Sequence, residues 1–314
     1  MIKNIIFFAF IALLTVSCQE SFYARGEKRT ETARYETLRQ QLKKEARGIK
    51  AEVGIAVLTD RGDTVTVNND RRYPMMSVFK FHQALAVADF LRSRHISIDS
   101  LITVTQADLP EGTYSPLRDE HHEQIFRISI KELLTYTLQR SDNNACDILF
   151  NRFVSPERTD IFVRSFGVKE FSMTETEADM HRSLNRCYRN WTSPLAASQL
   201  LKIFYEKLST QDYRYAFIKE TMENCRTGED RLKKPLMGKD AKIGHKTGTG
   251  DKNSRGEIIG INDIGFVTLP DGRHYFISIF IKDSHEDAAT ASATIARISQ
   301  LIYDFIKNDR TDRQ

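Results

Sequence analysis

Three short strings of residues, in a fixed order along the chain, constrain its fold more than any other feature. They are Ser77-Val78-Phe79-Lys80, Ser141-Asp142-Asn143 and Lys246-Thr247-Gly248, and Glu177 lies between the second and the third. Together they are typical of enzymes that form an acyl ester on a serine hydroxyl. Because the strings are far apart in sequence, a fold that uses them must bring three distant segments and Glu177 to one site.

The first string combines a nucleophile with a base. A helix from Ser77 to about Arg94 would place Ser77 and Lys80 on one face, one turn apart. A lysine can accept the serine proton only if burial or a second positive charge lowers the lysine pKa, and Lys246 can supply that charge. Ser-x-x-Lys alone also fits an ordinary helix start, so the inference depends on the three strings together.

The other two strings carry groups that suit the same reaction. The Ser141 hydroxyl can pass a proton to a leaving amine, and the Asn143 amide can hold a substrate amide. Lys246 offers a positive charge for a substrate carboxylate, and Thr247 and Thr249 add hydroxyls beside it. These residue types predict a site for an anionic amide substrate.

Longer stretches around these strings make the chain resemble class A serine β-lactamases, particularly the cephalosporin-active, extended-spectrum branch found in anaerobic Gram-negative bacteria. The resemblance extends from about residue 46 to the C-terminus. It rests on Pro74-Met75-Met76-Ser77-Val78-Phe79-Lys80, Ser141-Asp142-Asn143-Asn144, Asn190-Trp191-Thr192-Ser193-Pro194 and His245-Lys246-Thr247-Gly248.

The resemblance implies a role for each matching residue. Ser77 would be the nucleophile, Lys80 a base or proton relay, Ser141 the proton shuttle and Lys246 the carboxylate anchor. Glu177 would activate the water that hydrolyses the acyl ester. Whether the lysine or the glutamate accepts the serine proton during acylation is left open.

Further residues follow from the same resemblance as substrate contacts. Tyr114 would form an aromatic wall at the site entrance, and Asn143, Thr247 and Gly248 would line the site. The backbone N–H groups of Ser77 and Thr249 would form the oxyanion hole. No metal and no cofactor are expected.

The omega loop around Glu177 departs from the commonest class A pattern. An arginine–aspartate ion pair usually closes its neck, but Glu175 and Asn190 stand at those positions, so the loop must be held in another way. His181 and Asp147 replace two asparagines, as in the extended-spectrum branch. His181 is a candidate substrate contact, with a surface or packing histidine as the alternative.

Arg231 is the candidate for the arginine that supports the substrate carboxylate. It lies in Thr227-Gly228-Glu229-Asp230-Arg231-Leu232, an alternative family position, whereas much of the family carries this arginine on the strand after Lys-Thr-Gly. A solvated surface arginine is the competing interpretation.

The fold class expected is α/β of the α+β type, the serine β-lactamase and penicillin-binding-protein fold. Hairpins are predicted near both chain ends, at 53–67 and 258–281, with helices at 36–49 and around 295–306. The resemblance implies a sheet of about five antiparallel strands, built from both ends of one domain, 35–314. The sheet lobe would comprise 35–70 and 225–314, and the helical lobe 71–224.

The N-terminus predicts export. Residues 1–17 contain Lys3 and a short apolar run, the pattern of a signal peptide, and Cys18 suggests a lipobox. Residues 18–34 would be a lipidated N-terminus and tether, which places the protein in the periplasm with membrane attachment through Cys18. Cleavage without lipidation is the alternative, because Thr15 departs from the usual leucine-like residue.

Composition excludes several function classes. The formal charge of +4 is spread along the chain, so no nucleic-acid partner is expected, and the protein should act as a monomer. His121-His122-Glu123 is a poor zinc site, since no second His or Cys cluster accompanies it. Cys146, Cys187 and Cys225 are expected to be buried, unpaired thiols.

The sequence therefore predicts a β-lactamase, a hydrolase that acts on cyclic amides, with cephalosporins as preferred substrates. Met76 stands where some carbapenem-hydrolysing relatives carry a cysteine, which argues against carbapenem hydrolysis. Two alternatives use the same serine: a penicillin-binding protein acting on D-Ala-D-Ala peptides, and a β-lactam sensor that stays acylated. A penicillin-binding protein would lack a carboxylate poised for deacylation, so Glu177 argues against it. A sensor is expected to carry a transmembrane partner domain, which this sequence does not show.

Overall fold

The computed structural model describes residues 33–309. The predicted signal peptide, Cys18 and most of the predicted tether lie outside these residues. Within the described part of the chain, no helix is long and apolar enough to cross a membrane.

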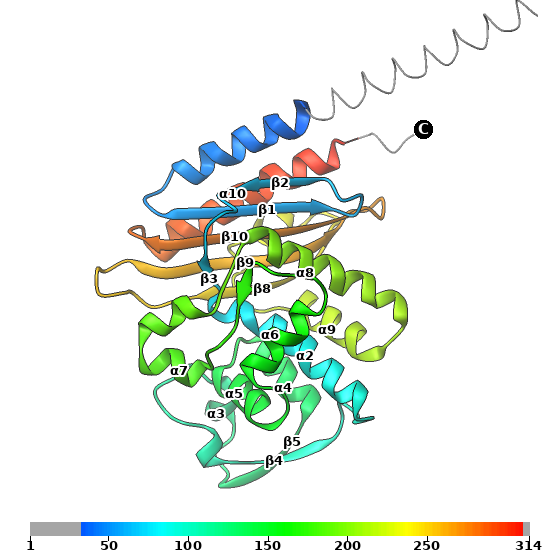
Figure 1. Ribbon diagram of the computed structural model, residues 1–314, viewed down its shortest axis with the longest axis vertical. Helices are drawn as coiled ribbons and strands as arrows, with labels where there is room; N and C mark the ends of the chain where they lie inside the picture. The colour runs from blue at the N-terminus through cyan, green and yellow to red at the C-terminus, as the bar shows by residue number, and fades with distance from the viewer. Residues whose placement is uncertain (1–32, 310–314) are drawn as a thin grey trace, which may run out of the picture.

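One five-stranded antiparallel sheet forms the upper part of the molecule in Figure 1. Its strand order is β2-β1-β10-β9-β8. The strands are β1 (Glu52–Thr59), β2 (Thr64–Val67), β8 (Lys242–Thr249), β9 (Ile258–Thr268) and β10 (His274–Ser284). The expected sheet built from both chain ends is therefore confirmed, and β8, which carries Lys-Thr-Gly, is an edge strand.

Both faces of the sheet are buried, because neighbouring residues of a strand point to opposite sides. On β10, Ile277 and Ile279 pack with the helix over residues 33–47 and with α10 (Ala288–Lys307). Phe276 and Phe280 on the same strand belong to the second core, which extends into the helical lobe. Ser198 of α8 (Pro194–Lys207) reaches across this second face to Ser278, at 2.9 Å between hydroxyls.

The helical lobe lies below the sheet in Figure 1 and is built around α2 (Phe79–Ser93). Eleven of the fifteen residues of α2 are buried, as expected for a central helix. The helices around it are α3 (Pro116–Glu120), α4 (Ile130–Gln139), α5 (Asn143–Arg152), α6 (Pro156–Arg164), α7 (Glu177–Arg182) and α9 (Tyr213–Glu223).

Short strands and 3-10 turns interrupt this largely helical middle. Two small sheets have the orders β3-β7-β6 and β4-β5. Their strands are β3 (Tyr73–Pro74), β4 (Leu101–Thr105), β5 (Ile125–Ser129), β6 (Phe171–Ser172) and β7 (Trp191–Thr192). The 3-10 turns are η1 (Met76–Val78), η2 (Gln106–Asp108), η3 (Leu184–Arg189), η4 (Leu208–Thr210) and η5 (Lys234–Leu236).

The start of the central helix differs from the sequence prediction. Ser77 lies in η1, and the α-helix begins two residues later, at Phe79. Met76, just before the serine, has a left-handed backbone with φ of 47°. A non-glycine residue in that conformation is strained and needs tertiary support. Here η1 packs against β8 and β9, contacts that local periodicity does not reveal.

Candidate active site

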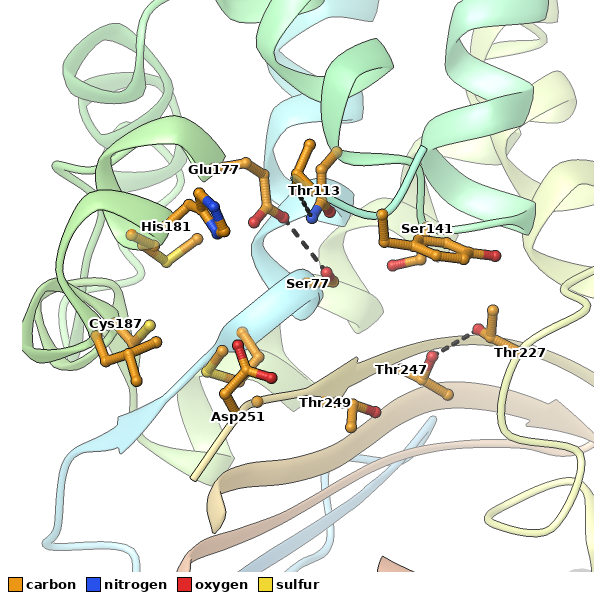
Figure 2. Close-up of a pocket in the computed structure, with 16 residues that line it drawn as sticks. Ser77, Thr113, Ser141, Glu177, His181, Cys187, Thr227, Thr247, Thr249 and Asp251 are labelled. Carbon is orange, nitrogen blue, oxygen red and sulfur yellow. Dashed lines mark hydrogen bonds between the residues drawn. The ribbon is translucent and has the colours of Figure 1, made fainter. Parts of the chain in front are cut away.

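A cavity of about 330 Å³ lies between the edge strand β8 and the helical lobe. Figure 2 shows Ser77 near its centre, Glu177 and His181 on one side, and Thr247 and Thr227 on the other. The full lining is Met76, Ser77, Thr113, Tyr114, Ser141, Asn143, Glu177, Met180, His181, Leu184, Cys187, Thr227, Thr247, Thr249, Gly250 and Asp251. The structure thus brings the three strings and Glu177 to one cavity.

Lys80 links the nucleophile to its surroundings. Its side chain is fully buried, and Nζ donates to Ser77 Oγ at 3.1 Å. The same Nζ donates to the Ser141 carbonyl at 2.7 Å and to Asn143 Oδ1 at 2.6 Å, and it lies 2.8 Å from Glu177 Oε1. Four oxygen atoms therefore fix the ammonium group beside the serine hydroxyl.

Glu177 is the first residue of α7 and faces the serine. Ser77 Oγ donates to Glu177 Oε1 at 3.4 Å, the dashed contact in Figure 2. The start of α7 is fixed by a capping box between Thr176 and Asp179. Asp147 adds a second support, since it accepts the backbone N–H groups of Glu177 at 2.9 Å and Ala178 at 2.8 Å.

The charge of Asp147 interacts with that of Glu177. Burial, and then the nearby Glu177 carboxylate, raise the pKa of Asp147 to about 7. Its two hydrogen bonds to backbone N–H groups act in the opposite direction. Through these hydrogen bonds, Asp147 on α5 holds the start of α7, and with it Glu177, against the neighbouring helix.

The neck of the omega loop is held by the side-chain amide of Asn190 and by ion pairs of Glu175. Asn190 is fully buried: its Oδ1 accepts the N–H groups of Thr174 at 2.8 Å and Glu175 at 3.0 Å, and its Nδ2 donates to the Glu175 carbonyl at 2.8 Å. The buried Glu175 carboxylate pairs with Arg186, and with Arg189 at 3.3 Å. These contacts close the neck without the arginine–aspartate pair of the commonest class A pattern.

Ser141 lines the cavity on the side opposite Glu177, and the Lys246 side chain lies beside it without lining the cavity. Lys246 is fully buried, and its Nζ donates to Ser141 Oγ at 2.9 Å and to the Thr247 carbonyl at 2.9 Å. Burial, and then the positive charge of Lys80, lower the pKa of Lys246 to about 7. Ser141 has a left-handed backbone with φ of 59°, so its hydroxyl is held by a strained turn between the two lysines.

Most of the remaining predicted contacts line the cavity, whereas Gly248 and Arg231 lie behind its wall. Asn143, Tyr114, His181, Thr247 and Thr249 line the cavity, and the Tyr114 side chain is exposed at the surface. Asn143 Nδ2 also donates to Thr113 Oγ1 at 2.8 Å, a partner that sequence reasoning missed although it adjoins Tyr114.

Gly248 lies behind the cavity wall and has a steric role. A Cβ atom there would approach the Met75 carbonyl to 2.6 Å and the Ser77 nitrogen to 3.2 Å. Only glycine lets β8 come this close to the turn that holds the serine. Gly248 therefore sets the distance between Lys-Thr-Gly and the nucleophile.

Arg231 lies behind β8 and is buried, so the solvated-surface interpretation is wrong. Its guanidinium donates to Thr249 Oγ1 at 2.7 Å and to the carbonyls of Gly248 and Asn262, both at 3.0 Å. It does not line the cavity. Through Thr249, however, it supports the edge of the cavity where a carboxylate would bind.

The described residues contain no group of three or more His, Cys, Asp or Glu side chains that could hold a metal ion. Cys146, Cys187 and Cys225 are free and buried, and Cys187 contributes to the cavity wall.

Comparisons with known sequences agree with this geometry. Residues 36–306 match the family described as "Beta-lactamase enzyme family". A protein named "Beta-lactamase" from Bacteroides uniformis is 39% identical over 299 residues, which cover 95% of this chain and 99% of that protein. "Extended-spectrum beta-lactamase PER-1" from Pseudomonas aeruginosa is 33% identical over 269 residues, which cover 85% of this chain and 87% of that protein.

Solved structures give the same result for the fold. The crystal structure of the TLA-3 extended-spectrum beta-lactamase superimposes with a TM-score of 0.83 at 38% identity, covering 86% of this chain and 98% of that one. A representative class A beta-lactamase from Bacteroides cellulosilyticus also superimposes with a TM-score of 0.83, at 39% identity, covering 88% of this chain and 99% of that one.

Proposed function

This chain belongs to the class A serine β-lactamases, enzymes that hydrolyse β-lactams, and we propose that it does so through an acyl ester on Ser77, with cephalosporins as preferred substrates. The observation that carries this proposal is the position of the Lys80 ammonium group, 3.1 Å from Ser77 Oγ and 2.8 Å from Glu177 Oε1. The Lys80 nitrogen and a carboxylate oxygen of Glu177 thus both lie beside the nucleophile.

Acylation begins when Ser77 Oγ attacks the carbonyl carbon of the β-lactam. The serine proton passes to Glu177, or to Lys80 once that lysine is neutral, and both groups contact Ser77 Oγ. The backbone N–H groups of Ser77 and Thr249 are the proposed donors to the carbonyl oxygen as its negative charge develops.

Ring opening requires a proton on the leaving nitrogen. Ser141 is the proposed shuttle: its hydroxyl proton moves to the nitrogen, and Lys246, which donates a hydrogen bond to that hydroxyl, replaces it. The proton taken from Ser77 is released to solvent, from which Lys246 regains its own, so Glu177 is ionised again before deacylation. Lys246, Thr247 and Thr249 form the edge proposed to bind the substrate carboxylate, with Arg231 behind Thr249.

Deacylation needs a water molecule and a base. Glu177 is the proposed base, because its carboxylate faces Ser77 and therefore the ester that would form there. Water attacks the ester carbonyl, Glu177 takes its proton, and Ser77 Oγ leaves with a proton returned through the same network. This step separates a hydrolase from a penicillin-binding protein or a sensor that stays acylated.

The proposed preference for cephalosporins rests on the resemblance to the extended-spectrum branch. PER-1 and TLA-3 are described as extended-spectrum β-lactamases. The side of the cavity next to Glu177 is lined by residues from three segments: His181 and Met180 of α7, Leu184 and Cys187 of η3, and Asp251 after β8. We assign the acyl side chain of the cephalosporin to this side.

Hydrolysis of a chromogenic cephalosporin by the purified protein, compared with Ser77→Ala, tests the proposed function. We expect the wild type to turn over the cephalosporin. Ser77→Ala should neither turn it over nor be labelled covalently by a fluorescent penicillin. Persistent labelling of Ser77→Ala would exclude Ser77 as the nucleophile. Comparing turnover of a penicillin, a cephalosporin and a carbapenem tests the preference, which fails if the cephalosporin is not the best substrate.

The proposed location is the periplasm, with a lipid anchor on Cys18. Cell fractionation of the full chain and of Cys18→Ser tests it. The wild type should sediment with membranes, whereas Cys18→Ser should be released in soluble form. Equal amounts of both proteins in the soluble fraction would contradict the anchor.

A further inference from the structure

A buried group of ionisable side chains lies behind the proposed carboxylate-binding edge and has no role in the reaction described above. It consists of Cys225, His245 and Asp263, each at most 2% exposed. Asp263 on β9 pairs in register with Thr247 on β8, and His245 lies two residues before Thr247. Because alternate residues of a strand share a face, His245, Thr247 and Asp263 lie on one side of the sheet edge.

Hydrogen bonds connect this group to the cavity. His245 Nδ1 lies 3.0 Å from both carboxylate oxygens of Asp263. Cys225 Sγ is 3.4 Å from Thr227 Oγ1, which is 2.6 Å from Thr247 Oγ1. Both threonines line the cavity, and Figure 2 shows the contact between them as a dashed line. A continuous path therefore leads from a buried thiol to the cavity surface.

His245 and the thiol interact. His245 Nε2 is buried and has no well-formed hydrogen-bond partner among the described residues. Burial disfavours a charged imidazole, but Asp263 and then Cys225 outweigh burial and raise the pKa of His245 to about 10. Asp263 and Cys225 thus favour a charged His245, and a charged His245 in turn favours a thiolate on Cys225.

The direction of the hydrogen bonds depends on the thiol proton, because each threonine hydroxyl has only one proton to donate. A neutral Cys225 can donate to Thr227, Thr227 then donates to Thr247, and the Thr247 proton is free to point into the cavity. A Cys225 thiolate can only accept. Thr227 must then donate to sulfur, and Thr247 must donate to Thr227, away from the cavity.

We propose that Cys225, with His245 and Asp263 behind it, is a positioning residue that sets through Thr227 whether Thr247 donates a hydrogen bond to the substrate carboxylate. Loss of the Cys225 proton to solvent reverses the two threonine hydrogen bonds. No covalent bond is formed or broken in this reversal apart from the S–H bond. The inference rests on the proposed function, since it assumes that the carboxylate of a β-lactam binds beside Thr247.

Charged groups on several elements surround the thiol. The charges of His245 and Lys246 on β8 act on the thiol, Arg231 interacts with it from the preceding loop, and Asp263 on β9 lies behind His245. The end of α4 presents only the carbonyl groups of residues 138 and 139. Burial alone would raise the pKa of Cys225, but His245 and Lys246 lower it to about 7. The thiol thus titrates near neutral pH.

The sign of the effect follows from these directions. Below about pH 7 the thiol is neutral, Thr247 donates to the carboxylate and KM for a β-lactam is low. Above that pH the thiolate withdraws the hydrogen bond, so KM rises while kcat changes less. Lys246 also loses its proton in this range, so the wild-type profile alone does not identify the relay.

Thr227→Val isolates the relay, because valine has nearly the shape of threonine and leaves both charges, Cys225 and Lys246, in place. The ratio of KM at pH 8.5 to KM at pH 6 should be roughly tenfold smaller in Thr227→Val than in the wild type, the effect of one hydrogen bond to a charged group. Thr227→Ser, which keeps the hydroxyl, should restore the wild-type ratio. The same ratio in wild type and Thr227→Val would overturn the relay.

The thiolate itself is measured separately, by its ultraviolet absorbance during a pH titration of the folded protein. Cys225→Ser should remove one thiolate transition near pH 7. No difference between the titrations would refute the ionisation of Cys225, whatever the enzyme kinetics. Failure of the wild type to hydrolyse any β-lactam would instead refute the proposed function, which separates the two conclusions.

Discussion

Replacing Asn190 by alanine should loosen the omega loop and separate the two steps of the reaction. The Asn190 side chain is fully buried and makes three hydrogen bonds to the backbone of Thr174 and Glu175, at 2.8, 3.0 and 2.8 Å. Alanine leaves two N–H groups and one carbonyl without partners. Each unsatisfied buried group costs about 1–3 kcal/mol, and partial access of water makes a total of about 3 kcal/mol reasonable.

A loss of this size is measurable. For a domain of this length, about 3 kcal/mol corresponds to a fall in melting temperature of roughly 6–12 °C. Because Glu177 follows the clamped residues by two positions, deacylation should slow more than acylation. Stopped-flow mass spectrometry with a cephalosporin should then detect accumulated acyl-enzyme.

Asn224→Ala is the matched control for Asn190→Ala. Asn224 is exposed at the end of α9, and its Nδ2 donates to one carbonyl of its own helix. Its loss should change the melting temperature by less than about 2 °C. If Asn190→Ala melts like Asn224→Ala and deacylates at the wild-type rate, the amide does not hold the loop.

Three further predictions concern buried groups around the site. Burial lowers the pKa of His82 from 6.5 to about 4, so between these pH values unfolding is accompanied by proton uptake. The free energy of unfolding should therefore fall by up to about 3 kcal/mol from pH 6.5 to pH 4. Denaturant titrations of His82→Leu should no longer show this pH dependence, and an unchanged dependence would show that it does not come from His82. Arg186→Ala should reduce thermal stability more than Arg189→Ala, because Arg186 is the less exposed partner of Glu175; equal melting temperatures would contradict this. Gly248→Ala should lower kcat/KM roughly a hundredfold, since its Cβ would lie 2.6 Å from a backbone oxygen beside the nucleophile, and near-normal kinetics would show that β8 can move away.

Much of the frame follows from patterns that are local in sequence. Alternating apolar residues and a turn at Arg61-Gly62-Asp63 predicted the first hairpin, which the structure has as β1 and β2. The amphipathic spacing near the C-terminus predicted α10. The three strings were predicted to meet, and they line or adjoin one cavity.

What the sequence did not reveal depends on long-range contacts. The left-handed backbone at Met76 and Ser141 has no signal in residue type, because glycine and asparagine are the usual occupants of that conformation. The amide contacts of Asn190 take the place of the arginine–aspartate pair of the commonest class A pattern, and only the folded loop neck reveals them. Burial of Arg231 depends on β8 and β9 closing over it.

Covalent mass and turnover, measured for wild type and Glu177→Gln with a chromogenic cephalosporin, decide whether Glu177 drives hydrolysis of an ester on Ser77. We expect rapid turnover by the wild type, with no lasting mass change. Glu177→Gln should form a trapped acyl-enzyme, with Ser77 carrying the added mass. Stable acylation of both proteins without turnover would contradict the role of Glu177 and would indicate a penicillin-binding protein or a β-lactam sensor.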